Sequence, residues 1–292
     1  MLTANVERWR AAGGFEQVAG RRLYVQRRAG EGDGPTLLLL HGFPSSSYDW
    51  RELLALRPRR AALAFDCLGF GLSDKPANVE YTLAWQADAA EELVRRAGSP
   101  AVFLVGHDMG TSVATELMAR ELEGRGRLEI AGALLFNGSI LQRTASPTTG
   151  QRLLRTRLGP LFARLTTARS FRLQFRRIFS AAHPLTRAEA DDQWALLSHD
   201  GGHRIGHLLI NYMAERERLT ERWHGAVRDW PGRLSLAWGL EDPVATTAVL
   251  DGLRALRPGV PVCELPGIGH YPQLERPDLI AAALDDALAE VR

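Results

Sequence analysis

Short apolar runs alternate with segments of helical periodicity along most of the 292 residues, and this alternation constrains the fold more than any other feature. The apolar runs cover residues 36–40, 61–65, 101–105, 131–136, 234–238 and 260–265. Segments with helical spacing lie between or after them, at residues 82–97, 111–121 and 278–291. Buried strands that alternate with helices in this way form a parallel sheet covered by helices. The sequence therefore predicts an α/β fold.

The alternation stops between residues 139 and 230, where no strong strand candidate occurs. Amphipathic, arginine-rich segments replace it, with predicted helices at residues 153–165, 170–179, 187–197 and 205–219. Because no low-complexity linker flanks these residues, we expect them to pack on the sheet as a lid. The predicted organisation is a first core part at residues 1–138, a helical cap at residues 139–230 and a second core part at residues 231–292.

The sequence Gly106-His107-Asp108-Met109-Gly110 follows one apolar run and precedes a helical segment. Glycines on both sides of a central residue permit the sharp strand-to-helix turn of a nucleophile elbow, which raises one side chain above the edge of the sheet. Asp108 occupies that central position. The alternative, an acidic residue in an ordinary turn, does not account for the other parts of a catalytic site elsewhere in the chain. Asp108 is therefore the candidate nucleophile.

Loops after other predicted strands carry those parts. Asp242 follows the run at 234–238 and His270 follows the run at 260–265, which gives the chain order nucleophile, acid, base. The segment His41-Gly42-Phe43-Pro44 follows the run at 36–40, where such sheets place an oxyanion loop. We expect His270 to act as the base and Asp242 to orient it. The backbone N–H groups of Phe43 and Met109 are the expected oxyanion-hole donors.

With these parts, the chain resembles the α/β-hydrolase superfamily over nearly its full length. Two further stretches are typical of that superfamily, residues 66–73 (DCLGFGLS) and residues 270–277 (HYPQLERP). The resemblance implies a mostly parallel eight-stranded sheet flanked by helices, with an inserted helical cap. The Asp nucleophile resembles that of epoxide hydrolases and dehalogenases. Asn137-Gly138-Ser139, Arg222-Trp223 and the HYPQLE stretch resemble the family of mesoderm-specific transcript protein and its bacterial relatives.

A carboxylate in the elbow favours attack on a saturated carbon over acyl transfer. A serine oxygen that attacked such a carbon would leave an ether, which histidine and water cannot cleave. A carboxylate leaves an ester, and water activated by His270 can hydrolyse that ester at the carbonyl carbon of Asp108. We therefore predict an epoxide hydrolase that opens an apolar small-molecule epoxide to a vicinal diol with water and without a cofactor.

Opening an epoxide also requires a proton or a strong hydrogen bond at the departing oxygen. The resemblance to epoxide hydrolases implies that lid tyrosines supply it, and Tyr212 is the one tyrosine in the predicted cap. A second lid tyrosine has no counterpart in this sequence. Either Tyr212 acts alone, or another lid group such as His183, His203 or His207 assists it.

Two other functions remain open. A haloalkane or haloacid dehalogenase would use the same covalent step, but Phe43 and Met109 lack the side-chain donors that would assist a departing halide. A non-catalytic binding protein that retains the fold is the second alternative, because a fold does not establish turnover.

Several residues are expected to be structural. Cys67 and Cys263 form no metal or disulfide pattern, and we interpret both as core residues. His41 and His107 do not occupy the base position, so we expect them to be buried, hydrogen-bonded supports. Aromatic residues at helical spacing in the cap are more typical of a core than of a substrate pocket, and these are Phe171, Phe175, Phe179 and Trp194.

The composition favours a small-molecule substrate. Lys and Arg number 36 against 34 Asp and Glu, a balance that disfavours a nucleic-acid partner. No apolar run approaches the ~20 residues needed to span a bilayer, and the charged N-terminus is unlike a secretory signal. We therefore expect a cytoplasmic location without stable membrane insertion. Neither a metal site nor a phosphate-binding loop is predicted, and a homodimer remains open.

Overall fold

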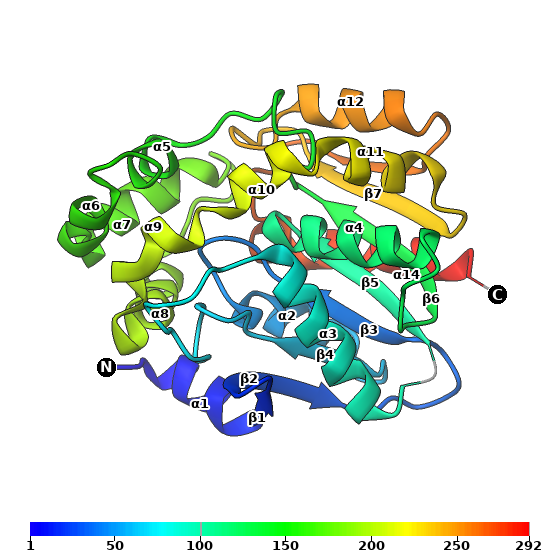
Figure 1. Cartoon of the computed structure of the whole chain (residues 1–292), viewed down its shortest axis with the longest axis horizontal. Coiled ribbons are helices and arrows are strands. Elements are labelled where there is room, and N and C mark those ends of the chain that lie inside the picture. Colours follow the sequence, from blue (N-terminus) through cyan, green and yellow to red (C-terminus); the bar gives the residue numbers. More distant parts are fainter. Residues whose placement is uncertain (100, 292) are drawn as a thin grey trace.

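The computed structural model describes residues 1–99 and 101–291 and is built around an eight-stranded sheet (Figure 1). The strand order is β1-β2-β4-β3-β5-β6-β7-β8. β1 pairs antiparallel with β2, which pairs antiparallel with β4, whereas every later pair is parallel. The strands are β1 (Gly14–Val18), β2 (Arg21–Arg28), β3 (Thr36–Leu40), β4 (Ala62–Phe65), β5 (Val102–His107), β6 (Ile130–Phe136), β7 (Arg233–Gly239) and β8 (Val262–Leu265). The predicted α/β fold class is confirmed.

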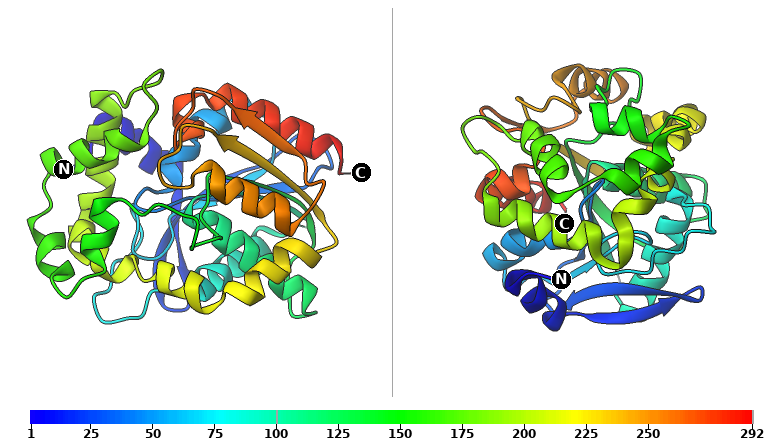
Figure 2. Two further views of the ribbon diagram at one scale, coloured as in Figure 1. Left: turned by 90° about the horizontal axis from the view of Figure 1, so that it is seen from above. Right: turned by 90° about the vertical axis from the view of Figure 1, so that its left-hand side faces the viewer.

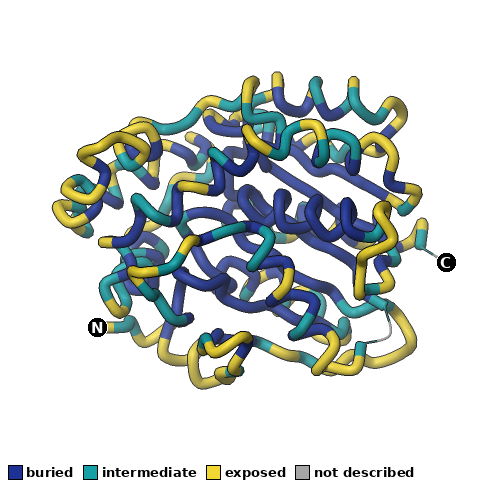
Figure 3. Tube along the Cα trace, in the orientation of Figure 1, coloured by how far each residue is buried: buried dark blue, intermediate teal, exposed yellow. Residues whose placement is uncertain are grey.

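Helices cover both faces of this sheet (Figure 2). Alternating side chains of a buried strand reach opposite faces, so Leu38 and Leu40 belong to one apolar cluster and Leu37 and Leu39 to another. The first cluster includes side chains of α3 (Leu83–Ala97), α4 (Met109–Leu122), α11 (Thr220–Asp229) and α12 (Thr247–Leu256). The second includes side chains of α2 (Arg51–Leu56) and α14 (Pro277–Ala289). The central strands of the sheet and α4 are buried along most of their length (Figure 3).

The cap segment, residues 139–230, is largely helical. Its elements are α5 (Thr149–Leu154), α6 (Gly159–Leu165), α7 (Ala168–Phe175), η2 (Arg176–Ile178), α8 (Arg187–Ser198), η3 (His199–Ile205), α9 (Gly206–Leu209), α10 (Tyr212–Arg218) and α11. α11 packs against α4 and α12, so this last helix of the segment belongs to the layer that covers the sheet. The predicted domain boundaries at residues 138 and 230 stay a prediction.

Two of the predicted cap helices are interrupted. The prediction of one helix over residues 153–165 was wrong, because α5 ends at Leu154 and α6 begins at Gly159. Pro160 lies in the first turn of α6, and a proline fits there but cannot continue a helix from before. The predicted helix over residues 205–219 is divided between α9 and α10 at residues 210–211.

The sequence analysis did not identify the N-terminal elements of the fold. These are α1 (Ala4–Ala12) and the hairpin of β1 and β2. β2 reads RRLYVQRR, so charged residues at both ends obscure the short apolar centre that packs in the core. Other elements that were not predicted from the sequence are η1 (Ser47–Trp50), α2, η3, α11, α12 and α13 (Pro272–Glu275).

Both cysteines are free, and Cys67 packs in one of the apolar clusters while Cys263 packs against the other. This placement fits their interpretation as core residues. Within residues 1–99 and 101–291, no helix has both the length and the apolar character needed to cross a membrane.

Gly110 lies closer to neighbouring backbone than any other glycine at the edge of the sheet, and we expect its replacement to destabilise the fold. A Cβ at this position would lie 2.0 Å from the carbonyl oxygen of Leu40. Because both partners are backbone atoms, we expect Gly110→Ala to lower the free energy of unfolding by about 3 kcal/mol, measured by urea denaturation. Gly14→Ala is the matched control, since a Cβ there meets nothing within 4 Å. Equal losses in the two variants would contradict this account.

Candidate active site

Asp108 lies at the sharp turn between the end of β5 and the start of α4. Its backbone has φ 44° and ψ −108°, a conformation that is unfavourable for a residue with a side chain. The carbonyl of Asp108 accepts hydrogen bonds from the N–H of Thr111 at 3.2 Å and from Oγ1 of Thr111 at 2.7 Å. These contacts hold the strained turn. The side chain is only 1% exposed, yet it lines a small cavity beneath the cap segment.

The loop after β3 brings a backbone donor to this carboxylate. The N–H of Phe43 donates to Oδ2 of Asp108 over 2.8 Å. Gly42 permits the approach, because a Cβ there would lie 2.7 Å from Cβ of Asp108. Met109 is the first residue of α4, where a helical N–H has no partner within the helix. The structure thus places both predicted oxyanion residues next to the nucleophile, with a hydrogen bond from Phe43.

Asp242 and His270 lie on the loops that follow β7 and β8, and their side chains are in contact. Nδ1 of His270 is 2.7 Å from Oδ2 of Asp242, and both side chains are buried. Oδ1 of Asp242 accepts the N–H groups of Val244 at 2.7 Å and Ala245 at 3.0 Å, which fixes the carboxylate. A carboxylate at Nδ1 assigns the proton of a neutral imidazole to that nitrogen. Nε2 is then left as the acceptor, as a base requires.

Asn137 is a further residue of the site. In the sequence it was noted only as part of a stretch that resembles the mesoderm-specific transcript family. It directly follows β6 and has φ 45°. Its Nδ2 donates to Oδ2 of Asp242 over 2.7 Å, and its Oδ1 accepts the N–H of Gly239 at 3.0 Å. Asn137 therefore ties the loops after β6 and β7 together and helps to hold the acid. Its place at the end of a predicted parallel strand, at the same edge as Asp108, was a sequence indication of proximity.

The loop that carries His270 is anchored to the cap segment. The N–H of His270 donates to the carbonyl of Ile178 over 2.8 Å. Oε2 of Glu275 accepts the N–H of Gly269 at 2.9 Å and the N–H of Ser180 at 3.0 Å. The position of the imidazole therefore depends on the packing between cap and core.

The other two histidines of the site serve as supports. Nε2 of His107 is 2.7 Å from the carbonyl oxygen of His270, and Nδ1 of His107 is 3.0 Å from Nε2 of Gln273. Nε2 of His41 accepts the N–H of Cys67 at 3.0 Å. Both rings are buried with backbone partners, as expected from their positions outside the base loop.

Burial and nearby carboxylates act in opposite directions on the pKa of His270. Desolvation lowers this pKa, but the charge of Asp242, its hydrogen bond to the ring and the charge of Asp108 raise it, and the net pKa is raised. Burial lowers the pKa of His107 well below its usual value, and the neighbouring His270 adds to this effect. The carboxylates around His270 therefore favour its protonated form more than water does around a free imidazole.

Tyr212 lies beside Asp108 in the small cavity and is fixed by Gln151. Nε2 of Gln151 donates to the Tyr212 hydroxyl over 3.2 Å, and Oε1 of Gln151 accepts the N–H of Thr148 at 2.8 Å. Because this hydroxyl accepts from Gln151, its own proton is available for a group in the cavity. Burial, followed by the charge of Asp108, raises the pKa of Tyr212, so the hydroxyl keeps its proton near neutral pH.

Arg216 is a charged group at the site that the sequence analysis missed. It lies one turn after Tyr212 on α10 and is 2% exposed. Nη2 donates to the carbonyl of Asp108 over 2.9 Å and lies 3.8 Å from its Oδ1, while Nε donates to Oγ of Ser112 over 2.8 Å. The guanidinium lies 4.7 Å from the centre of the Tyr212 ring. The i, i+4 spacing from Tyr212 was the sequence indication that both residues share a helix face.

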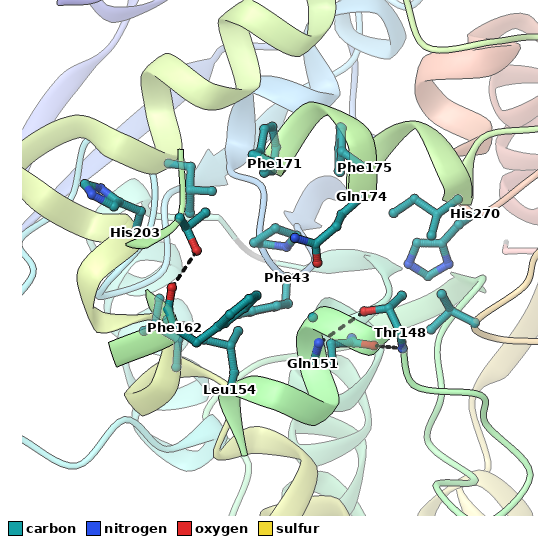
Figure 4. Close-up of a pocket in the computed structure, with 18 residues that line it drawn as sticks. Phe43, Thr148, Gln151, Leu154, Phe162, Phe171, Gln174, Phe175, His203 and His270 are labelled. Atoms are coloured by element: carbon teal, nitrogen blue, oxygen red, sulfur yellow. Dashed lines mark hydrogen bonds between the residues drawn. The ribbon is translucent and has the colours of Figure 1, made fainter. Parts of the chain in front are cut away.

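A larger cavity of ≈ 110 Å³ lies between the sheet and the cap segment, with His270 in its wall (Figure 4). Phe171 and Phe175 of α7 line it and are also buried in an apolar cluster with Ile178, Val244 and Tyr271, as expected of core residues. α7 is amphipathic, and its apolar face forms the wall of the cavity. Trp194 and Phe179 pack behind that wall, with ring centres 5.8 Å from Phe171 and 5.3 Å from Phe175 respectively.

The polar residues of the larger cavity narrow the choice of a lid group that could assist Tyr212. His203 lines the cavity, but Figure 4 shows it at the opposite end from His270. His183 and His207 are not part of the wall. Gln151 contacts the Tyr212 hydroxyl directly and lines both cavities, so it is better placed than these histidines to assist Tyr212.

These residues together form an arrangement suited to covalent catalysis. A buried carboxylate faces a cavity, an imidazole held by an acid lines the adjoining cavity, and a backbone N–H and a phenol flank the carboxylate. In the part of the chain that the structure describes, no cluster of three or more His, Cys, Asp or Glu side chains is arranged to hold a metal ion.

Comparison with known proteins gives a match of residues 37–283 to the model of the alpha/beta hydrolase family. The chain is 50% identical to LipZ of Mycobacterium tuberculosis over 97% of this chain and 98% of LipZ. It is 34% identical to the mesoderm-specific transcript protein of Mus musculus, over 94% of this chain and 85% of that protein. It is 28% identical to haloalkane dehalogenase 2 of Mycobacterium bovis, over 92% of both chains.

Among solved structures, the chain has the same fold as the epoxide hydrolase CorEH. The TM-score is 0.75 at 19% sequence identity, and the match covers 96% of this chain and 99% of CorEH. At this identity the likeness supports the fold alone. The resemblance to the superfamily and to the mesoderm-specific transcript family that the motifs indicated is confirmed.

Replacement of Asp242 tests the electrostatic account of His270. We expect Asp242→Asn to lower the pKa of His270, because the charge of Asp242 is the main influence that opposes desolvation. In the wild type the raised pKa means that His270 stabilises the fold at low pH and that this contribution is lost as pH rises through the folded-state pKa. The variant should lose that low-pH contribution. NMR titration of the His270 ring would measure the change.

Asp251→Asn is the control for this titration, because Asp251 lies on the exposed face of α12. This substitution also removes one negative charge, but at a position outside the site. An unchanged His270 pKa in Asp242→Asn, or an equal fall in both variants, would refute the account.

Proposed function

Because this chain belongs to the alpha/beta hydrolase family, we propose that it hydrolyses apolar epoxides to vicinal diols through an alkyl ester on Asp108. One observation carries the proposal: the carboxylate of Asp108 and the hydroxyl-bearing side chain of Tyr212 line the same small cavity. A nucleophile that forms a cleavable ester and a protonated phenol are the two groups that epoxide opening requires.

In the first step, a carboxylate oxygen of Asp108 attacks one epoxide carbon. The new C–O bond forms as the C–O bond to the ring oxygen breaks, and the electron pair of the broken bond moves to that oxygen. Tyr212 gives its proton to the oxygen, so the products are a hydroxyalkyl ester and a tyrosinate. Gln151 stabilises the negative charge through its N–H, which contacts the Tyr212 oxygen. The apolar walls of the larger cavity accommodate the remainder of the substrate.

In the second step, water attacks the carbonyl carbon of the Asp108 ester and His270 accepts a proton from this water. Esterification has removed the charge of Asp108, and that charge is one of the influences that raise the pKa of His270. The imidazole is therefore more readily neutral when a base is needed. Phe43 N–H and Met109 N–H stabilise the oxyanion of the tetrahedral intermediate. In its collapse the C–O bond to the alkyl oxygen breaks and this oxygen takes the proton of the added hydroxyl, so the diol is released and the carboxylate is restored. The proton held by His270 then returns through solvent to Tyr212.

A haloalkane dehalogenase is the second candidate, and Arg216 favours it. The sequence argument against this function was that Phe43 and Met109 offer no side-chain donor to a halide. The buried guanidinium of Arg216 lies next to the same cavity as Asp108 and provides a positive charge there. The relative named haloalkane dehalogenase 2 supports the same alternative at 28% identity.

A trapping experiment tests the covalent step. His270→Gln removes the base but leaves the nucleophile, so an epoxide should alkylate Asp108 and the ester should persist, with hydrolysis slowed by about 10³-fold or more. Peptide mass analysis would locate the adduct on the peptide that contains Asp108. His203→Gln is the matched control, because His203 lines the same cavity away from the base, and it should not accumulate ester.

The same assay separates the candidate functions. Diol formation from epoxides without halide release from haloalkanes is the expected result. Halide release would establish the dehalogenase alternative. A wild-type protein that forms neither product, and a His270→Gln variant without an adduct, would leave the non-catalytic binding protein as the remaining function.

The role of Tyr212 as proton donor has its own test. Tyr212→Phe should reduce the rate of alkylation by about 10²-fold, because the departing oxygen loses its acid, while hydrolysis of an existing ester should change little. Single-turnover kinetics would separate the two steps. Tyr81→Phe is the control, since the Tyr81 hydroxyl donates to the carbonyl of Pro76 outside the site. Unchanged alkylation in Tyr212→Phe would assign the proton to another group.

A further inference from the structure

Six of the ten residues that line the small cavity beside Asp108 are polar or charged. Among the residues that form its wall, Asp108 is the only acid and Arg216 the only base. Ser139 also lines it and is 2% exposed, yet its Oγ has no hydrogen-bond partner in the described part of the chain. A buried hydroxyl without a partner is uncommon in a folded protein. The cavity therefore contains unused hydrogen-bonding capacity next to a buried positive charge.

Arg216 depends on Asp108 for charge compensation. Its other polar contacts go to neutral oxygens, the carbonyl of Asp108 and the hydroxyl of Ser112. Within residues 1–99 and 101–291, the one carboxylate within 4.0 Å of its guanidinium is that of Asp108, at 3.8 Å. A buried charge that loses its partner is strongly unfavourable. Any event that neutralises Asp108 thus leaves a buried guanidinium that requires another anion.

We propose that the small cavity is an anion site that becomes available when Asp108 loses its charge. This inference rests on the proposed function, in which alkylation moves the negative charge from Asp108 to the departing oxygen of the epoxide. Arg216 and Ser139 would then bind that oxygen while its negative charge develops, before Tyr212 protonates it. The anion site explains why an arginine is buried beside a nucleophile whose reactivity its charge reduces.

The cavity also restricts the anion that fits. Its free space is ≈ 10 Å³, enough for about one water-sized group. A single oxygen atom or a halide ion fits this space, whereas sulfate or phosphate does not. Oε1 of Gln142 is a second atom of the wall without a partner, and a half-turn of that amide exchanges it for an N–H donor. The ligand class is a small monovalent anion.

Bromide binding to Asp108→Asn tests the site without any substrate. Asparagine has the shape of aspartate but no charge, so the variant mimics the alkylated state. We expect bromide to bind it at least about tenfold more tightly than it binds the wild type, measured by isothermal titration with sodium sulfate as the ionic-strength control. Crystals soaked in sodium bromide should show an anomalous peak between residues 139 and 216. Equal affinities, or a peak elsewhere, would overturn the proposal.

Two double variants identify the residues responsible. Arg216→Gln added to Asp108→Asn removes the charge and should abolish saturable binding. Ser139→Val added to Asp108→Asn fills the cavity but keeps the guanidinium, and it should also prevent binding. Because Arg216 connects cap and core, thermal unfolding would first establish that each variant is folded. If the Arg216 variant does not fold, bromide binding to the Ser139 variant alone tests the site. Bromide binding that survives in a folded double variant would refute the site.

A kinetic comparison distinguishes an epoxide oxygen from a halide as the natural occupant. Asp108 must be intact for this measurement, so it uses Arg216→Gln alone in single-turnover alkylation. We expect ester formation from an epoxide to slow by about tenfold or more, with the substrate Km changed less than the rate. A loss confined to bromoalkanes would assign the site to halide instead. If epoxides do not react at all but bromide still binds to Asp108→Asn, the proposed function fails and the anion site stands.

Discussion

Close backbone contact at Gly42, Gly106 and Gly110 is the constraint on which the site depends. At each position a Cβ would lie 3.0 Å or less from a neighbouring atom, so the loop after β3, the end of β5 and the start of α4 can converge. Their convergence holds Asp108 in its unfavourable backbone conformation and brings the N–H of Phe43 to its carboxylate. The position of Asp108 and its contact with Phe43 therefore follow from packing at the edge of the sheet, whereas the position of His270 also depends on its contact with the cap segment.

The buried charges of the site form a balanced set. Asp108 and Asp242 are negative, Arg216 is positive, and the surroundings raise the pKa of His270 toward the positive form. Under the proposed chemistry, alkylation moves one negative charge from Asp108 to the oxygen of Tyr212, and the proton that His270 takes from water in the second step later neutralises it. Because an unpaired charge is costly in a buried site, the electrostatics couple the two steps. The hydrogen bond from Asn137 helps to hold the carboxylate of Asp242 in place.

The sequence predicted those parts of the molecule that are encoded by local patterns. The glycines around Asp108 and the strand-to-loop positions of Asp242 and His270 are local, and the structure places His270 in contact with Asp242. Arg216 and Gln151 could not be assigned in this way, because their roles arise from contacts with residues far along the chain. The first hairpin was missed because charged residues surround its short apolar centre, whereas Pro160 was present in the sequence and marked a helix start that the analysis did not use.

Gln151 and Val244 belong to the walls of both cavities and separate a small polar space from a larger apolar one. The apolar space is formed by side chains of α6 and α7, whereas the polar space is formed by α10 and the loop after β6. Under the proposed function, substitutions on α6 and α7 would reshape the space for the remainder of the substrate and leave the residues around Asp108 in place. Substrate range could then change without a change in the reacting groups.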